Sequence, residues 1–337
     1  MHQDLGTYLR NKSLNLGLRA RTKITWHFKR RYIQPGCVAK ARNMFDIPAL
    51  SRLASLAPQH LKLPTYFCAN PKLKNMKLFD SHCHLNDRAY DKDIDAVIKR
   101  AHDAGVAACM VVGTDKESSI KAVALAKSIN GIYASVGIHP HETQSCSESI
   151  LKLLMNLAED PEVCAWGEIG LDFNRMYSPQ DDQEKWFIRQ LEIADKCNLP
   201  VIFHERDSNG RLLEIVRAHQ RKDGKGVVHC FSGNRAELEQ YINLGLYIGI
   251  TGILTLKKRG ADLRKLVPVI PVEQILIESD APYLTPAPEK NRTTRNEPAF
   301  VRQVLFKLAE IRKEDPEHLA SATWENSCRL FNVPKKT

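Results

Sequence analysis

The sequence predicts an α/β fold, a (β/α)8 TIM barrel that follows a separate basic extension. Two observations lead to this prediction. From Leu78 onward, short apolar or β-branched runs alternate with segments of helical periodicity, which is typical of βα units around a parallel sheet. Eight such units lie between residues 78 and 280, which favours a closed barrel over an open doubly wound sheet.

The predicted strands are apolar runs that end in glycine, proline or polar residues. They are Leu78–His84, Ala108–Gly113, Tyr133–His139, Cys164–Gly170, Pro200–Glu205, Gly226–Phe231, Leu246–Gly252 and Ile275–Asp280. Apolar residues at helical spacing lie between them, for example at 94–101, 150–157 and 186–194. Two further helices are expected after the last strand, at 297–312 and from Asp315 onward, where a capping residue precedes a proline.

Residues 1–75 form an extension whose composition differs from the rest of the chain. The net charge is +10, and residues 1 to 76 carry 14 Lys and Arg against two acids, whereas residues 77 to 337 carry 35 against 37. The basic character therefore belongs to the extension and says little about the barrel. Because prolines interrupt it, we expect residues 1–75 to be poorly ordered and the barrel domain to span 76–334.

Three interpretations of the extension stay open. It is Arg-rich and acid-poor, as organelle-targeting segments are. It also fits a basic arm for nucleic acid. Alternatively, it is sequence upstream of the true start, since Met76 opens directly onto the first predicted strand.

Composition also bears on location. The nine cysteines are scattered with no Cys-x-x-Cys pair, as expected of reduced thiols in the cytosol. No apolar run is long enough for a transmembrane helix or a signal peptide core, so we expect no membrane partner. The predicted location is cytoplasmic, with organelle targeting by residues 1–75 as the alternative.

Polar side chains end five of the predicted strands, where barrels of this class carry their chemistry. Singly, each is explained as a hydrogen-bonded structural residue, but together the six predict a metal site: His82, His84, Glu168, His204, His229 and Asp280. Imidazole and carboxylate without thiolate suit zinc, manganese, iron or magnesium. Six ligands exceed the need of one tetrahedral ion, so a two-metal centre bridged by Glu168 is the economical arrangement, with Cys83 facing away.

Five motifs, in this order, resemble those of the TatD family of metal-dependent deoxyribonucleases. They are FDSHCHLN at 79–86, GEIGLD at 167–172, VIFHERD at 201–207, HCFSG at 229–233 and ESDAPY at 278–283. The resemblance covers residues 77–333 and implies a metal-dependent hydrolase barrel with two divalent ions (Mg, Mn or Zn). By position, the family's metal ligands fall on the same six residues. Ser208 stands where the family commonly has alanine, which we do not expect to alter the metals.

The resemblance implies a phosphodiesterase, a 3′–5′ exonuclease on single-stranded DNA or RNA that uses a metal-activated water. Glu168 and Asp280 are then the predicted catalytic residues, with Asp280 placed to orient the water and take its proton. His139, Arg206 and Arg295 follow strands three, five and eight and are our candidates for contacting the substrate backbone, since arginine matches phosphate oxygens. For either arginine a solvated surface charge is the alternative, and His139 could instead support a ligand.

Two other functions stay open. One is a metal-dependent ester or amide hydrolase, such as an aminoacyl-tRNA deacylase; many related amide hydrolases bridge their metals with a modified lysine, where this chain has Glu168. The other is a non-catalytic nucleic-acid-binding protein that uses the basic extension.

Overall fold

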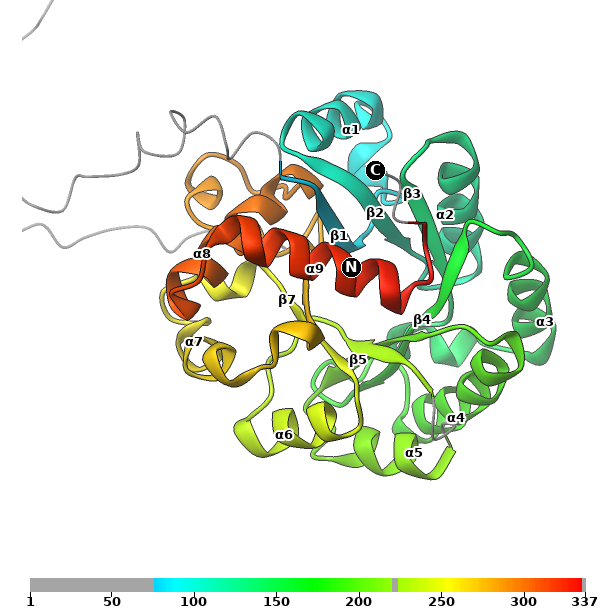
Figure 1. The fold of residues 1–337 in the computed structure, drawn as a ribbon. Coiled ribbons are helices and arrows are strands. Elements are labelled where there is room, and N and C mark those ends of the chain that lie inside the picture. Colours follow the sequence, from blue (N-terminus) through cyan, green and yellow to red (C-terminus); the bar gives the residue numbers. More distant parts are fainter. Residues whose placement is uncertain (1–75, 220–223, 335–337) are drawn as a thin grey trace, which may run out of the picture. The chain divides into compact units, whose positions relative to one another are not determined.

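The fold described here is that of a computed structural model, which describes residues 76–219 and 224–334; the predictions for residues 1–75 lie outside them. Eight strands form one parallel sheet in chain order, as predicted (Figure 1). They are β1 (Leu78–Cys83), β2 (Val106–Val112), β3 (Ile132–Val136), β4 (Val163–Asp172), β5 (Val201–Arg206), β6 (Gly226–Val228), β7 (Tyr247–Ile250) and β8 (Ile275–Ile277).

Backbone hydrogen bonds join the carboxyl end of β1 to the residues that directly follow β8. The amide of Asp280 donates to the carbonyl of His82 at 2.9 Å, and the amide of His84 donates to the carbonyl of Ala281 at 2.7 Å. The sheet is therefore closed into a barrel at the carboxyl ends of β1 and β8. The TIM-barrel prediction is confirmed.

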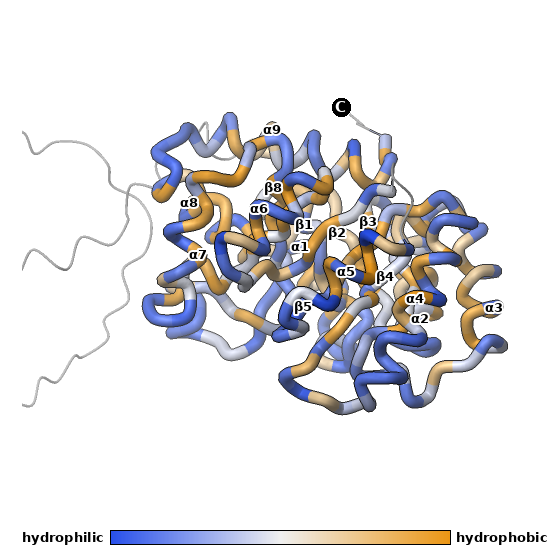
Figure 2. Tube along the Cα trace, turned by 90° about the horizontal axis from the view of Figure 1, so that it is seen from below, coloured by the Kyte–Doolittle hydropathy of each residue, from blue (hydrophilic) through white to orange (hydrophobic). Residues whose placement is uncertain are grey.

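Helices follow the strands around the barrel, in the order typical of βα units (Figure 1). They are α1 (Ile94–Asp103), α2 (Lys116–Ser128), α3 (Glu148–Leu157), α4 (Gln180–Cys197), α5 (Arg211–His219), α6 (Arg235–Asn243), α7 (Ala261–Leu266), α8 (Val301–Arg312) and α9 (Pro316–Leu330). Along the tube of Figure 2 the helices carry both apolar and polar residues, as expected of elements that bury one face. Within the described residues, no helix combines the length and apolar character that crossing a membrane requires.

The two carboxyl-terminal helices agree with the prediction except at one boundary. The prediction started α8 at residue 297, but the helix begins at Val301, after a 3-10 turn over Pro298–Phe300. In this turn the amide of Phe300 donates to the carbonyl of Glu297 at 2.9 Å, three residues back, which winds the chain more tightly than an α-helix. Helix α9 begins at Pro316 with Asp315 as its cap, as predicted.

Side chains fill the barrel below the carboxyl ends of its strands. Phe79, Met110 and Ile202 belong to a buried cluster that extends to Phe331, just after α9. The rings of Phe79 and Phe331 lie 5.8 Å apart between centroids. Helix α9 contacts the beginning of β1 and β8, so this cluster closes the amino-terminal end of the barrel (Figure 1). The opposite end is left for the polar residues.

Candidate metal centre

The carboxyl ends of the strands surround a cavity of about 910 Å³. All six predicted metal ligands meet here. Five of them line the cavity, namely His84, Glu168, His204, His229 and Asp280. The sixth, His82, is completely buried and lies 3.3 Å from Glu168 through its Nε2 atom.

Glu168 is the residue that connects the others. Its side chain is almost fully buried on β4, and Oε1 lies 3.6 Å from His139 Nε2, 4.0 Å from His229 Nε2 and within hydrogen-bonding distance of His204 Nδ1. Burial raises the pKa of Glu168, but the charges of His139, His82 and His229 outweigh it and hold the pKa well below its usual value. Glu168 is therefore an anion shared by several imidazoles.

The backbone conformation at residue 167 and its close approach to β5 require a glycine directly before Glu168. Gly167 has φ near +148°, and a Cβ atom there would lie 2.6 Å from the carbonyl oxygen of Ile202 on the neighbouring strand. Only glycine fits this close approach. The Gly-Glu pair of the fourth strand is thus a local requirement for placing the carboxylate in the barrel mouth.

Asp280 approaches the cluster from the opposite side of the barrel. Its Oδ1 atom lies 3.4 Å from His84 Nε2, 3.7 Å from His229 Nε2 and 3.8 Å from His82 Nε2. Burial raises the pKa of Asp280, whereas the hydrogen bond from His84 and the charges of His229 and His82 lower it, and the net direction is down. Asp280 is ionised at neutral pH.

Two groups of ligand atoms share Glu168. His82, His84 and Glu168 bring ligand atoms within 4.8 Å of one another, and His139, Glu168 and His204 do the same. Each group combines imidazole with carboxylate, a donor set that suits zinc, manganese or other divalent ions. The carboxyl end of the barrel therefore carries clusters that are able to bind metal. Cys83 packs away from them, with its thiol donating to the carbonyl of Met110.

Neighbouring carboxylates and burial shift the pKa values of these histidines in opposite directions. Burial lowers the pKa of His229 and of His204, but nearby carboxylates more than compensate: Glu278 and Glu168 raise the pKa of His229 to about 10, and Asp172 and Glu168 raise that of His204 to about 9. Burial lowers the pKa of His139 to about 4, with His204 adding to the effect. The cluster thus holds a few protons that a divalent ion would replace.

Two carboxylates that orient the ligands were not among the predicted site residues. Glu278 Oε2 accepts a hydrogen bond from His229 Nδ1 at 2.9 Å, which directs His229 Nε2 into the cluster. Asp172 Oδ2 lies 3.3 Å from His204 Nε2 and 2.7 Å from His141 Nε2. The sequence did hold a signal for both, since Glu278 precedes Asp280 by two residues in the predicted eighth strand and Asp172 ends the GEIGLD motif.

The predicted substrate contacts fall in different places. His139 and Arg206 line the cavity, and Arg206 makes no ion pair with any residue in the described part of the chain. Arg295 is not among the lining residues. Its guanidinium instead pairs with Asp93 at 2.7 Å and lies 5.1 Å above the ring of Tyr90. The structure brings His139 and Arg206 to the site and does not bring Arg295.

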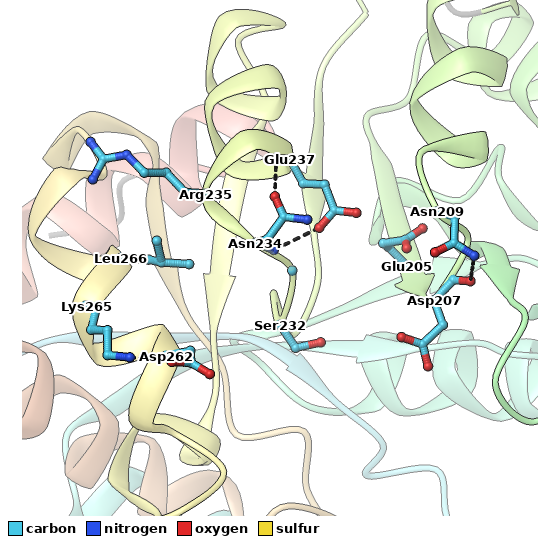
Figure 3. A pocket seen from close by; sticks show the side chains of 11 residues that line it. Glu205, Asp207, Asn209, Ser232, Asn234, Arg235, Glu237, Asp262, Lys265 and Leu266 are labelled. Carbon is cyan, nitrogen blue, oxygen red and sulfur yellow. Dashed lines mark hydrogen bonds and ion pairs between the residues drawn. The ribbon is translucent and has the colours of Figure 1, made fainter.

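A second cavity, of about 500 Å³, is lined by the side chains drawn in Figure 3. Along β5 the side chains alternate, so that Glu205 lines this second cavity while Arg206 lines the metal cavity. Glu205 accepts a hydrogen bond from the amide of Ser208 at 3.0 Å, which places Ser208 away from the ligands. Charged side chains of both signs line the second cavity, and none of the six predicted metal ligands is among them: Glu205, Asp207, Glu237, Asp262, Arg235 and Lys265.

Comparison with known proteins agrees with this geometry. The model of the TatD related DNase family matches residues 79–332. The 3′-5′ ssDNA/RNA exonuclease TatD of Shigella flexneri serotype 5b is 40% identical over 258 residues, which are 76% of this chain and 99% of that protein. The protein of the same name from Escherichia coli K12 is 39% identical over the same shares.

Solved structures show the same relationship. The TatD homologue YJJV of Escherichia coli K12 superposes with a TM-score of 0.70 at 32% identity, covering 76% of this chain and 98% of that one. A TatD family hydrolase of Entamoeba histolytica has a TM-score of 0.69 at 25% identity, covering 77% and 99%. The resemblance found in the motifs is confirmed, and the chain belongs to the TatD related DNase family.

Proposed function

We propose that this chain is a metal-dependent 3′–5′ exonuclease that hydrolyses phosphodiester bonds in single-stranded DNA or RNA. The observation that carries the proposal is the cluster of six candidate ligands, which includes the shared carboxylate Glu168, at a cavity also lined by Arg206 and Arg259, neither of which makes an ion pair with any described residue. Membership of the TatD related DNase family supports it, as do the names of the relatives.

The donor set fits two divalent ions, Mg²⁺, Mn²⁺ or Zn²⁺. We infer that His82, His84 and Asp280 would hold one ion, that His204 and His229 would hold the other, and that Glu168 would bridge them. When bound, such ions activate water and neutralise charge on the phosphoryl oxygens.

Residues of the chain supply three further roles, which are orienting the water, contacting phosphate and positioning the ligands. Asp280 is ionised and half-buried among the other candidate ligands, so it can orient the attacking water and accept its proton. Arg206, which has no ion-pair partner among the described residues, offers its planar guanidinium to a phosphate. The Nδ1 atom of His139 accepts the amide of His141 at 3.1 Å, so Nε2 carries the proton and faces Glu168 and His204. His139 therefore positions these two ligands.

Arg295 is left out of the proposed substrate contacts, because Asp93 and Glu297 already hold its guanidinium. For location we keep the cytoplasm, with an organelle as the alternative if residues 1–75 act as a targeting segment.

The decisive test uses the purified full chain with Mg²⁺, Mn²⁺ or Zn²⁺ on a 3′-labelled single-stranded oligonucleotide and, in parallel, on an aminoacyl-tRNA. Release of labelled nucleotides supports the exonuclease. Release of the amino acid alone would support the deacylase instead, and no nucleotide release with any of the three ions contradicts our proposal.

The same assay separates catalysis from simple binding by the extension. We expect Glu168→Ala to abolish nucleotide release, and deletion of residues 1–75 to leave it measurable. A non-catalytic nucleic-acid-binding protein predicts no nucleotide release at all, with strand binding that survives Glu168→Ala and is lost when the basic residues of the extension are deleted.

A further inference from the structure

Two tyrosines stand at the rim of the metal cavity with their rings largely open to solvent. Tyr177 is 62% exposed and Tyr283 is 54% exposed, and both line the cavity. Large rings are normally buried for their apolar area, so exposed rings beside a functional cavity point to a binding surface.

The tyrosines flank the cavity from opposite sides. Tyr177 lies in the connection between β4 and α4, and Tyr283 lies in the connection between β8 and α8. In a closed sheet with the order β1 to β8, the strands β4 and β8 are half a turn apart. These are also the strands that supply Glu168 and lead into Asp280, so the ligands lie between the two rings.

Each ring is held in place without being covered. The ring of Tyr177 meets that of His141 edge-on, with centroids 4.7 Å apart and planes at 64°. Tyr283 meets His84 in the same manner, at 5.8 Å and 67°. The Tyr283 hydroxyl donates to Asp87 Oδ2 at 3.3 Å. A rigid ring with an open face is preorganised for stacking, because little side-chain entropy remains to be lost.

The same cavity also carries positively charged side chains. Arg175, Arg206 and Arg259 line it. The last two make no ion pair with any residue of 76–219 or 224–334, so their guanidinium groups are available. Aromatic faces combined with arginines are the chemistry that recognises unpaired bases and the phosphates linking them.

We propose that Tyr177 and Tyr283 are stacking platforms for bases of the nucleic-acid strand and that they select single strands over duplex. Bases in a duplex are already stacked on their neighbours and present only their edges, so they cannot use these rings. The inference rests on the exonuclease function proposed above and extends it by assigning the residues that set strand preference.

The test compares Tyr177→Leu and Tyr283→Leu with Tyr177→Phe and Tyr283→Phe in the full chain. The substrates are a 3′-labelled single-stranded oligonucleotide and the same strand with abasic sites at its 3′ end. We expect each leucine variant to raise KM by about 5- to 100-fold on the normal strand with little change in kcat, and each phenylalanine variant to recover the wild-type KM because it keeps the ring. On the abasic strand the leucine variants should match the wild type.

Met176→Ala is the matched control, since Met176 adjoins Tyr177 and is 45% exposed but does not line the cavity. We expect it to leave KM unchanged. An unchanged KM in both leucine variants, or the same loss on normal and abasic strands, would overturn the stacking role.

Binding of the same two strands, followed by fluorescence anisotropy, separates this inference from the proposed function. If the wild type binds the normal strand without cleaving it and the leucine variants bind more weakly, the stacking role stands and the exonuclease function fails. If the wild type neither binds nor cleaves either strand, both fail.

Discussion

Glu168 illustrates how one side chain determines the chemistry of the site. Four histidines reach its two oxygens, and their interactions with the carboxylate hold its pKa well below the usual value although it is buried. Glu168→Gln keeps the shape and removes the charge. We expect turnover to fall by about 100-fold or more, because loss of even an outer partner of a metal ligand costs 10- to 100-fold. Steady-state assays measure this, and thermal unfolding checks that the variant folds; near-wild-type turnover would contradict the role of Glu168.

Glu278 acts on the site through His229. It accepts the hydrogen bond from His229 Nδ1 at 2.9 Å and is completely buried. In Glu278→Gln the amide no longer offers a negative acceptor, so His229 loses its preferred tautomer. We expect metal affinity to fall by about 10- to 100-fold, measured by titration calorimetry. Glu310→Gln, on an exposed carboxylate, serves as the control and should leave the affinity unchanged.

The raised pKa values of His204 and His229 make the affinity for metal depend on pH. With pKa values of about 9 and about 10 in the ion-free protein, both imidazoles hold protons at neutral pH. An ion must displace those protons, so affinity rises with pH between about 6 and 9 and binding releases protons. Calorimetry in buffers of different ionisation enthalpy measures the release. An affinity that does not change over this range would show that the two histidines are neutral before metal binds.

At the scale of residues, the sequence named six candidate ligands that the structure brings together, but not the carboxylates that orient them. The candidates stood out because each interrupts or ends an apolar run. The roles of Asp172 and Glu278 depend on which ring nitrogen faces them, which no spacing encodes. Arg295 follows strand eight in sequence, yet Asp93, 202 residues earlier, holds its guanidinium.

At the scale of elements, the apolar runs predicted all eight strands but not their ends. β6 and β8 have three residues each, so His229 and Asp280 lie just beyond the hydrogen-bonded ladder. The backbone turns there, with φ of +48° at Cys230 and +54° at Asp280. These turns aim the ligands at the cavity. They depend on tertiary contacts, such as the hydrogen bond from the Ser279 amide to Asp80 at 2.7 Å, and periodicity does not reveal them.

Helix α9 and the residues after it fill the amino-terminal end of the barrel, far from the cavity. Phe331 is 2% exposed and contacts Phe79 inside the barrel. Phe331→Ala should lower the free energy of unfolding by about 3–5 kcal/mol through lost burial and a cavity, while turnover per folded molecule is retained. Urea denaturation measures the loss. Val269→Ala, at an exposed site, should change it by less than about 0.5 kcal/mol, and an equal loss in both variants would contradict this account of α9.

At the scale of the whole molecule, the order of strands and helices was predictable from the sequence, and the eight βα units favoured a closed barrel. The sequence could not give the contacts that close it, which are the backbone bonds between residues 82–84 and 280–281. The overall charge likewise does not indicate where the substrate would bind. The overall charge of +10 arises in residues 1–76, but the arginines proposed to meet phosphate lie in the nearly neutral barrel.

The central claim, that two divalent ions held around Glu168 drive hydrolysis from the 3′ end, is tested most directly by one titration. Chelator-treated full chain is given increasing Mn²⁺ while label release is followed from 3′- and 5′-labelled single strands. We predict no release without the ion, a rise in activity that saturates near two ions per chain, and release of the 3′ label first. Full activity in the ion-free protein, or release that begins at the 5′ end, would contradict the account.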